Sequence, residues 1–169
     1  VDIRAIDADG TELEQVHFES LAPKAAISAN LTELFGPAVF LEGHDIWLMV
    51  ESPAEIRGVA VFGTKDRLGA TALPLFGLSA PDLVFPYVYI DQEWMTGLAV
   101  INVGRELAAV TFRAYSPTGE LISVQEVALP VWNKYARLID QMFPDVADPS
   151  RIRFVRADST QPLIGFEAF

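Results

Sequence analysis

Two stretches of the chain, VDIRAIDADG (residues 1–10) and VTFRAYSPTG (residues 110–119), resemble each other. Val, Arg, Ala and Gly coincide at matching positions, and the positions of Ile3 and Ile6 stay apolar in the second stretch. Each stretch is rich in apolar residues and ends in a turn at Gly10 or Gly119, because glycine supplies the positive φ that tight turns need. Both stretches therefore predict the first strand and turn of a β-hairpin.

Three further pairs of similar segments follow in the same order and at comparable spacing. They are 27–36 with 135–144, 46–52 with 152–158, and 55–62 with 162–169. Four pairs in one order indicate a duplicated module. In each copy we predict a hairpin, one short helix and two closing strands. The helices are predicted over 27–35 and 135–143, and the closing strands over 46–51, 56–62, 151–157 and 163–169.

The two copies differ in length. Residues 83–109 form an additional front part of the second copy and predict two strands, 83–90 and 95–103, joined by a polar turn at Asp91. We divide the chain into an incomplete first β-sandwich repeat (1–62), a linker with one short strand near 71–76 (63–82), and a complete second β-sandwich repeat (83–169). The predicted fold class is all-β, with tandem β-sandwich modules that each carry one short crossover helix.

The first copy has no counterpart of the leading hairpin, and this leaves an edge and part of a core open. Three resolutions stay open: upstream sequence supplies the hairpin, residues 83–104 complete the first copy instead of the second, or two chains exchange strands. The last resolution predicts a homodimer through the open edge of the first repeat.

Composition restricts the function classes. Half of the 169 residues are hydrophobic (51%) and 21% are charged, which is globular composition. The chain has no cysteine, and this excludes disulfides and cysteine-ligated metals. A net charge of −11 argues against nucleic-acid binding, and no apolar run predicts a membrane span. Residues 1–62 hold eleven acidic and three basic side chains, so the acidity lies mostly in the first copy.

Longer motifs add a resemblance to a family. WMTGLAVINVG (94–104) opens the second copy, and IRFVRADSTQPLIGFEAF (152–169) ends it. These strings resemble the tandem Ig-like β-sandwich repeat modules of bacterial secreted or cell-surface proteins. The matching residues are Trp94, Thr96, Gly97, Asn102 and Gly104 in the opening and Asp158, Pro162 and Gly165 in the ending. The resemblance implies an extracytoplasmic location (secreted, periplasmic or cell surface) and supplies no catalytic residue. Val1 begins no signal-peptide pattern, so we expect the export signal to lie outside this sequence.

Three aromatic residues are the candidate ligand-binding residues: Tyr87, Tyr89 and Trp94. Phe85, Tyr87 and Tyr89 alternate along one predicted strand and would share a face. Flat aromatic rings on such a face suit the stacking of sugar rings. The other face is apolar too, so packing in the core or at an interface between modules is the favoured interpretation.

Motifs for catalysis and metal binding are weak. Asp7-Ala8-Asp9-Gly10 resembles the start of a calcium loop but fits an ordinary hairpin turn better. His17 and His44 are the two histidines, at a spacing that matches no metal motif. The sequence has no nucleophile elbow and no glycine-rich phosphate loop. We expect no enzyme activity, no cofactor, no catalytic residue and no metal site.

These observations predict a non-catalytic structural or interaction module of an extracytoplasmic bacterial protein. Its partners would be neighbouring repeats or other proteins. The alternative is a carbohydrate- or ligand-binding β-sandwich module that uses the surface aromatics. Exposure of the three rings distinguishes the two interpretations.

Overall fold

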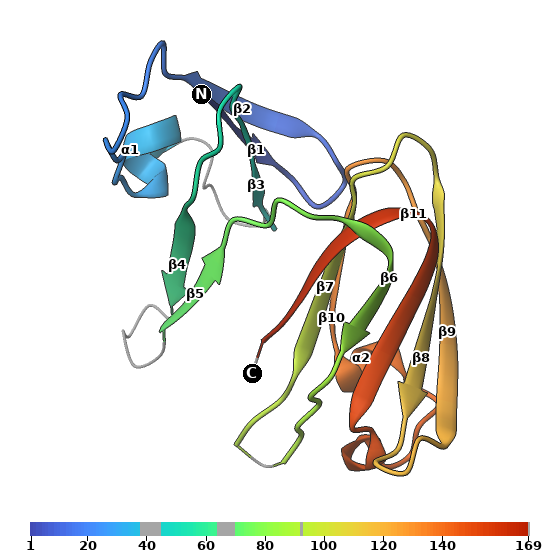
Figure 1. The fold of residues 1–169 in the computed structure, drawn as a ribbon. Coiled ribbons are helices and arrows are strands. Elements are labelled where there is room, and N and C mark those ends of the chain that lie inside the picture. The colour runs from blue at the N-terminus through green and yellow to red at the C-terminus, as the bar shows by residue number, and fades with distance from the viewer. Residues whose placement is uncertain (38–44, 64–69, 92, 169) are drawn as a thin grey trace.

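The computed structural model describes residues 1–37, 45–63, 70–91 and 93–168. Strands dominate these residues, and the helices are short (Figure 1). The predicted all-β fold class is therefore confirmed. None of the helices in the described residues is long and apolar enough to cross a membrane.

Strands from the N-terminal part of the described chain form a three-stranded antiparallel sheet. Its strands are β1 (Asp2–Ile6), β2 (Glu12–His17) and β3 (Trp47–Glu51), in the order β2-β1-β3. Helix α1 (Leu31–Phe35) packs its buried Phe35 with Ala5 of β1. The helix begins later than the predicted residue 27 because Asn30 caps it, accepting a hydrogen bond from the backbone N–H of Glu33 (2.9 Å).

A second, separate pairing joins β4 (Val59–Gly63) to β5 (Ala70–Pro74). The predicted closing strand at 56–62 corresponds to β4, and the short strand expected near 71–76 corresponds to β5. All five residues of β4 are exposed. The stretch predicted as a linker, 63–82, thus contains β5 and the first residues of β6.

The remaining chain forms a six-stranded sheet. Its strands are β6 (Ala80–Phe85), β7 (Gly97–Asn102), β8 (Ala108–Tyr115), β9 (Leu121–Leu129), β10 (Lys134–Leu138) and β11 (Phe154–Ala168). The order is β10-β7-β11-β8-β9, and β6 also pairs with β11. The first half of β11 pairs with β8 and its second half with β7, so one long strand joins both halves of the sheet (Figure 1).

The main hydrophobic core lies inside this six-stranded sheet. Strand β8 alternates buried and outward residues, as half-buried strands do, whereas β7 buries Leu98, Ala99 and Val100 in succession. Helix α2 (Ile139–Met142) closes the core with its buried side chains. The largest fully buried side chains of this core are Phe112, Phe143, Leu98, Ile139, Met142, Ile152 and Leu163.

The predicted helix over 135–143 is wrong in its first half. Residues 134–138 form strand β10, which pairs with β7, and only Ile139–Met142 are helical. The ring of Tyr135 packs against Phe112 at a centroid distance of 5.6 Å. The periodic apolar residues of this segment are therefore buried by a strand and a helical turn together, because sheet pairing outweighs local helical periodicity.

The prediction of two separate closing strands, over 151–157 and 163–169, is also wrong. They belong to one strand, β11, whose pairing with β6 shifts register between Asp158 and Leu163. The backbone N–H of Val103 donates to the carbonyl of Pro162 (3.1 Å). The bulged segment thus stays in the sheet because neighbouring strands take up its hydrogen bonds.

The predicted hairpin of 83–90 with 95–103 is reduced to one bridge, between Ile90 and Met95. Strand β6 pairs with β11 instead of β7. Pro86, which has no backbone N–H to donate, follows the last residue of β6 directly.

The sheets that hold the two similar stretches are paired in matching register. His17 and Glu51 lie opposite Asp2 in β2-β1-β3, and Glu126 and Asp158 lie opposite the aligned Thr111 in β9-β8-β11. The register therefore places Glu51 at the position of Asp158, one residue beyond Ala157, with which the sequence comparison pairs it. Both hairpins shift register at the aligned place, after Ala5 in β1 and after Ala114 in β8. The two sheets therefore share their strand pairing, and residues at the same place in this shared register are called aligned below.

The β1–β2 turn lies against the six-stranded sheet. The backbone N–H of Lys134 donates to the carbonyl of Ala8 (2.8 Å). The ammonium of Lys134 forms an ion pair with Asp45 (2.5 Å). The guanidinium of Arg4 lies 6.0 Å from the ring centroid of Trp132. Polar contacts thus connect the two sheets at this turn.

Gly10 and Gly119 provide a matched test of that contact. Their φ angles are 84° and 81°, so alanine is strained at both. A Cβ at Gly10 would lie 2.7 Å from the side-chain amide of Asn133 and 3.1 Å from the carbonyl oxygen of Val131, whereas nothing lies within 4 Å at Gly119.

We expect Gly119→Ala to cost about 1 kcal/mol of unfolding free energy. Gly10→Ala should cost at least about 1 kcal/mol more, because it also displaces a packed neighbour. Urea denaturation measures both, and equal losses would contradict the contact.

Asn102 provides a test of the core. Its buried amide donates to the carbonyls of Glu106 (2.8 Å) and Leu129 (2.9 Å) and accepts from the N–H of Gly104 (2.9 Å). We expect Asn102→Ala to lose about 2 to 4 kcal/mol of unfolding free energy, because three backbone groups lose their partner and two of these hydrogen bonds are buried. Chemical denaturation measures this loss. Gln125→Ala is the control, since its amide bonds only the neighbouring carbonyl of Glu126, and a similar loss in both variants would refute this role.

Candidate functional site

The three aromatic residues singled out in the sequence lie between β6 and β7 and are exposed. The exposed fractions are 54% for Tyr87, 38% for Tyr89 and 54% for Trp94. The rings of Tyr87 and Tyr89 are parallel to within 1°, with centroids 6.3 Å apart. These rings are therefore not core residues, and their packing at an interface between modules stays a prediction. We call Tyr87, Tyr89 and Trp94 the aromatic platform.

The two tyrosines of the platform point outward because the alternation of buried and exposed side chains shifts by one residue after β6. Phe85 and Val88 are both buried, so the inward positions here are three residues apart instead of two. The shift falls at Pro86 and turns Tyr87 and Tyr89 outward. The prediction that Phe85 shares their face is therefore wrong, because Phe85 packs in the main core.

Asp91 organises the turn between Tyr89 and Trp94. One carboxylate oxygen accepts the backbone N–H groups of Glu93 and Trp94, each at 2.8 Å. The other oxygen accepts the hydroxyl of Tyr89 (2.8 Å). The two N–H donors, followed by the hydroxyl, lower the pKa of Asp91, and the same carboxylate raises the pKa of Tyr89. The platform therefore carries a fixed negative charge at its edge.

Buried Thr96 connects both sides of the turn. Its hydroxyl accepts the backbone N–H of Tyr89 (2.8 Å) and donates to the carbonyl of Tyr89 (2.9 Å). The backbone N–H of Thr96 donates to the same carbonyl (3.1 Å). Tyr89 is thus held by three hydrogen bonds, which orders the platform before any ligand arrives.

Glu167 of β11 supports the platform from the sheet. Its carboxylate accepts the backbone N–H of Tyr87, and burial raises its pKa. One of its oxygens, Oε2, is buried without a hydrogen-bond partner. A carboxylate in this environment costs stability when it is ionised.

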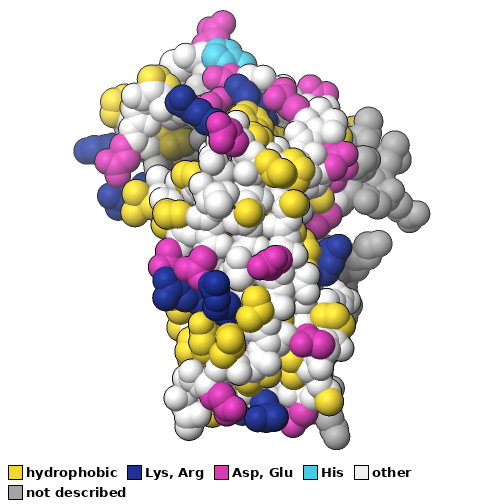
Figure 2. All heavy atoms as spheres, turned by 90° about the vertical axis from the view of Figure 1, so that its right-hand side faces the viewer, with side chains coloured by type: hydrophobic (Ala, Val, Ile, Leu, Met, Phe, Trp, Pro, Cys, Tyr) yellow, Lys and Arg dark blue, Asp and Glu magenta, His cyan; other side chains and the backbone are white. Residues whose placement is uncertain are grey.

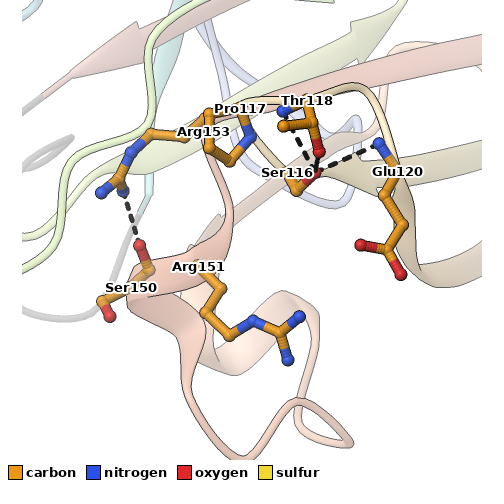
Figure 3. A pocket seen from close by; sticks show the side chains of 7 residues that line it. All are labelled: Ser116, Pro117, Thr118, Glu120, Ser150, Arg151 and Arg153. Atoms are coloured by element: carbon orange, nitrogen blue, oxygen red, sulfur yellow. Dashed lines mark hydrogen bonds between the residues drawn. The ribbon is translucent and has the colours of Figure 1, made fainter.

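A cavity of about 430 Å³ lies between the turn after β8 and the residues that precede β11 (Figure 3). The backbone N–H of Val88 donates to the carbonyl of Arg153, and Arg153 lines this cavity. Its guanidinium donates to the carbonyl of Ser150 (2.5 Å), as Figure 3 shows. On the opposite wall the hydroxyl of Ser116 accepts the N–H groups of Thr118 and Glu120. Hydroxyl and guanidinium groups around an open cavity suit an oxygen-rich ligand.

The remaining candidates from the sequence do not assemble into a site. In the turn after β1, Asp7 accepts the N–H of Ala8 (2.8 Å) and Asp9 accepts the N–H of Thr11 (2.9 Å), as in an ordinary hairpin. His17 contacts Asp2 (2.8 Å), and His44 lies outside the described residues. In the part of the chain that the structure describes, no group of three or more metal-ligating side chains comes together.

Acidic, basic and apolar side chains are mixed on the face of the molecule shown in Figure 2. Arg156 pairs with Asp82 (2.6 Å) and with Asp158 (3.1 Å). No broad basic patch covers the described residues on this face.

Sequence reasoning missed the residues that support the platform. Asp91 was seen only as a turn residue and Thr96 only as part of the opening motif. Arg153 and Glu167 lie far along the chain and carry no local signal. Their role depends on the pairing of β11, which the sequence pattern did not specify.

Comparisons with known proteins assign no family to this chain. No family model matches the chain, and no curated protein matches it. Among solved structures, the "Anabaena sensory rhodopsin transducer" is similar, with 14% sequence identity and a TM-score of 0.46. The match covers 56% of this chain and 100% of that protein.

Glu167→Gln tests the buried carboxylate. Because the folded-state pKa is raised above the usual 4.5, folding favours the protonated form, and stability falls as the pH rises through the folded-state pKa. We expect Glu167→Gln to raise the Tm at pH 7 by about 1 to 3 °C and to leave it unchanged near pH 4.

Thermal unfolding at both pH values measures this difference. Glu126→Gln on β9 is the control, because that side chain is exposed and should give no change. If Glu167→Gln raised the Tm equally at pH 7 and near pH 4, the result would contradict a cost that comes from ionisation of Glu167.

Proposed function

We propose that this chain is a non-catalytic binding module whose aromatic platform takes the flat face of a carbohydrate ring. One observation carries the proposal: Tyr87 and Tyr89 present parallel, exposed rings at the molecular surface. Large exposed aromatic rings lose favourable burial unless a ligand covers them. Their interplanar angle of 1° and centroid distance of 6.3 Å show two stacked rings that share one orientation.

Polar groups beside the platform fit the hydroxyls of a sugar. Asp91 offers carboxylate oxygens at one edge, and the cavity on the side of Arg153 offers hydroxyl and guanidinium groups. Ligand sites commonly combine an apolar surface with a few fixed polar groups of this kind.

The two carboxylates at the platform, Asp91 and Glu167, suit ligand binding better than catalysis. Asp91 already accepts three hydrogen bonds, and its pKa is lowered. A general acid for glycoside cleavage requires a raised pKa. Glu167 has a raised pKa, but its carboxylate lies against the backbone of Tyr87.

The second candidate function is a structural or interaction module of an extracytoplasmic bacterial protein with an Ig-like, tandem-repeat architecture. The exposed apolar residues of β4 favour protein contacts, with Val59 61%, Val61 69% and Phe62 49% exposed. The location rests on the sequence resemblance. The two proposals are compatible, because a repeat can bind carbohydrate through one surface and protein through another.

Alanine variants of the platform test carbohydrate binding. We expect the chain to bind members of a printed glycan array, and the best binder then serves for isothermal titration. Tyr87→Ala, Tyr89→Ala and Trp94→Ala should each weaken binding about tenfold, because each removes one stacking surface.

Phe76→Ala is the matched control, since Phe76 is similarly exposed (43%) but lies outside the platform, and it should bind like the parent chain. An array without binders, or equal losses in the platform and control variants, would overturn the proposal.

A further inference from the structure

The open edge of β3 can be compared with an occupied edge elsewhere in this chain. Strand β3 aligns with the first half of β11, and both lie beside aligned partners, β1 and β8. The side-chain pairs agree as well, because Arg4 pairs with Glu51 (2.7 Å) and the aligned Arg113 pairs with Asp158. The six-stranded sheet therefore shows what covers an edge of this type.

In the six-stranded sheet, β6 covers that edge. It runs antiparallel to β11 and places Phe85 opposite Val155 and Leu83 opposite Ala157. Phe85 belongs to the core, and Leu83 packs against it. In the three-stranded sheet, no strand among the described residues pairs with the corresponding edge of β3.

Burial differs between the two sheets accordingly. Val155, Ala157 and Phe112 are fully buried in the six-stranded sheet. The aligned residues Leu48, Val50 and Ile3 are only half-buried. The apolar cluster around Ala5 and Phe35 therefore keeps surface available for one more strand.

We propose that the edge of β3 binds an extended strand of another protein, antiparallel to β3, by strand addition. The bound segment would place apolar side chains opposite Val50 and Leu48, as Leu83 and Phe85 lie opposite Ala157 and Val155. Backbone hydrogen bonds would provide affinity, and the two apolar positions would provide specificity. This surface is distinct from the aromatic platform.

Charge favours a foreign strand over a second copy of this chain. In β6, Asp82 lies opposite Asp158, and Arg156 neutralises the pair. The residue aligned with Arg156 is Met49, so Glu51 has the cation of Arg4 but no counterpart of Arg156 to neutralise a second acidic side chain opposite it. Like charges placed opposite each other destabilise strand pairing, so the bound strand should carry a basic residue at that position.

Three peptides test the proposal on the full chain. The first has the sequence of residues 79–90, the second carries Asp82→Lys, and the third carries Asp82→Lys with Leu83→Asp and Phe85→Asp. We expect the second peptide to bind about two- to fivefold more tightly than the first, because it pairs a lysine with Glu51. The third peptide should not bind. NMR titration of the backbone amides of Leu48–Glu51 locates the contact and gives Kd.

Charge reversal on the protein tests the register. In Glu51→Lys the preference should invert, so that the native Asp82 peptide binds more tightly than the Asp82→Lys peptide. Glu14→Lys on β2 is the control, because β2 forms the opposite edge of this sheet, and the preference should not change.

The proposal is overturned if the β3 amides do not respond to any peptide, or if Val155–Asp158 respond instead. It is also overturned if the third peptide binds as well as the second. Sedimentation of the chain without peptide supplies one more check. A concentration-dependent dimer that perturbs the β3 amides would assign the edge to a second copy and refute the foreign strand.

Discussion

Strand β11 is the element on which the six-stranded sheet depends, because it pairs with β6, β7 and β8. A β-strand satisfies its backbone groups only through its neighbours, so a strand shared by three partners fixes their relative positions. The pairing also requires close approach at Gly165, where a Cβ would lie 3.0 Å from both Leu83 and Phe85. A larger residue at this position would press on these two side chains and on the carbonyl oxygen of Ala99 (3.1 Å).

The aromatic platform is a consequence of that pairing. Strand β6 buries Phe85 against the core and ends at Pro86, and Val88 returns to the core two residues later. Tyr87 and Tyr89 then have to point outward. The turn at Asp91 and the hydroxyl of Thr96 hold them there, so the orientation of both rings is fixed by buried or hydrogen-bonded neighbours. A preformed surface of this kind loses little conformational entropy when it binds.

The two similar stretches show that equal strand pairing does not give equal burial. Registers and bulges agree between β1–β2–β3 and β8–β9–β11. The six-stranded sheet adds β6, β7 and β10, and its core is fully enclosed. The three-stranded sheet buries only Ala5 and Phe35 in its cluster. The difference lies in long-range partners, and these determine which surfaces stay available for other molecules.

Local sequence determined the all-β class, the turns at Gly10 and Gly119, the strands around them and the choice of Tyr87, Tyr89 and Trp94 as candidates. Those features depend on residues close together in the chain, where glycine conformations and apolar alternation act directly. The tertiary structure alone decided that Tyr135 lies in a strand, that β11 is continuous and that the tyrosine rings face outward. Each of these depends on pairing between segments far apart in sequence, so local periodicity does not specify them.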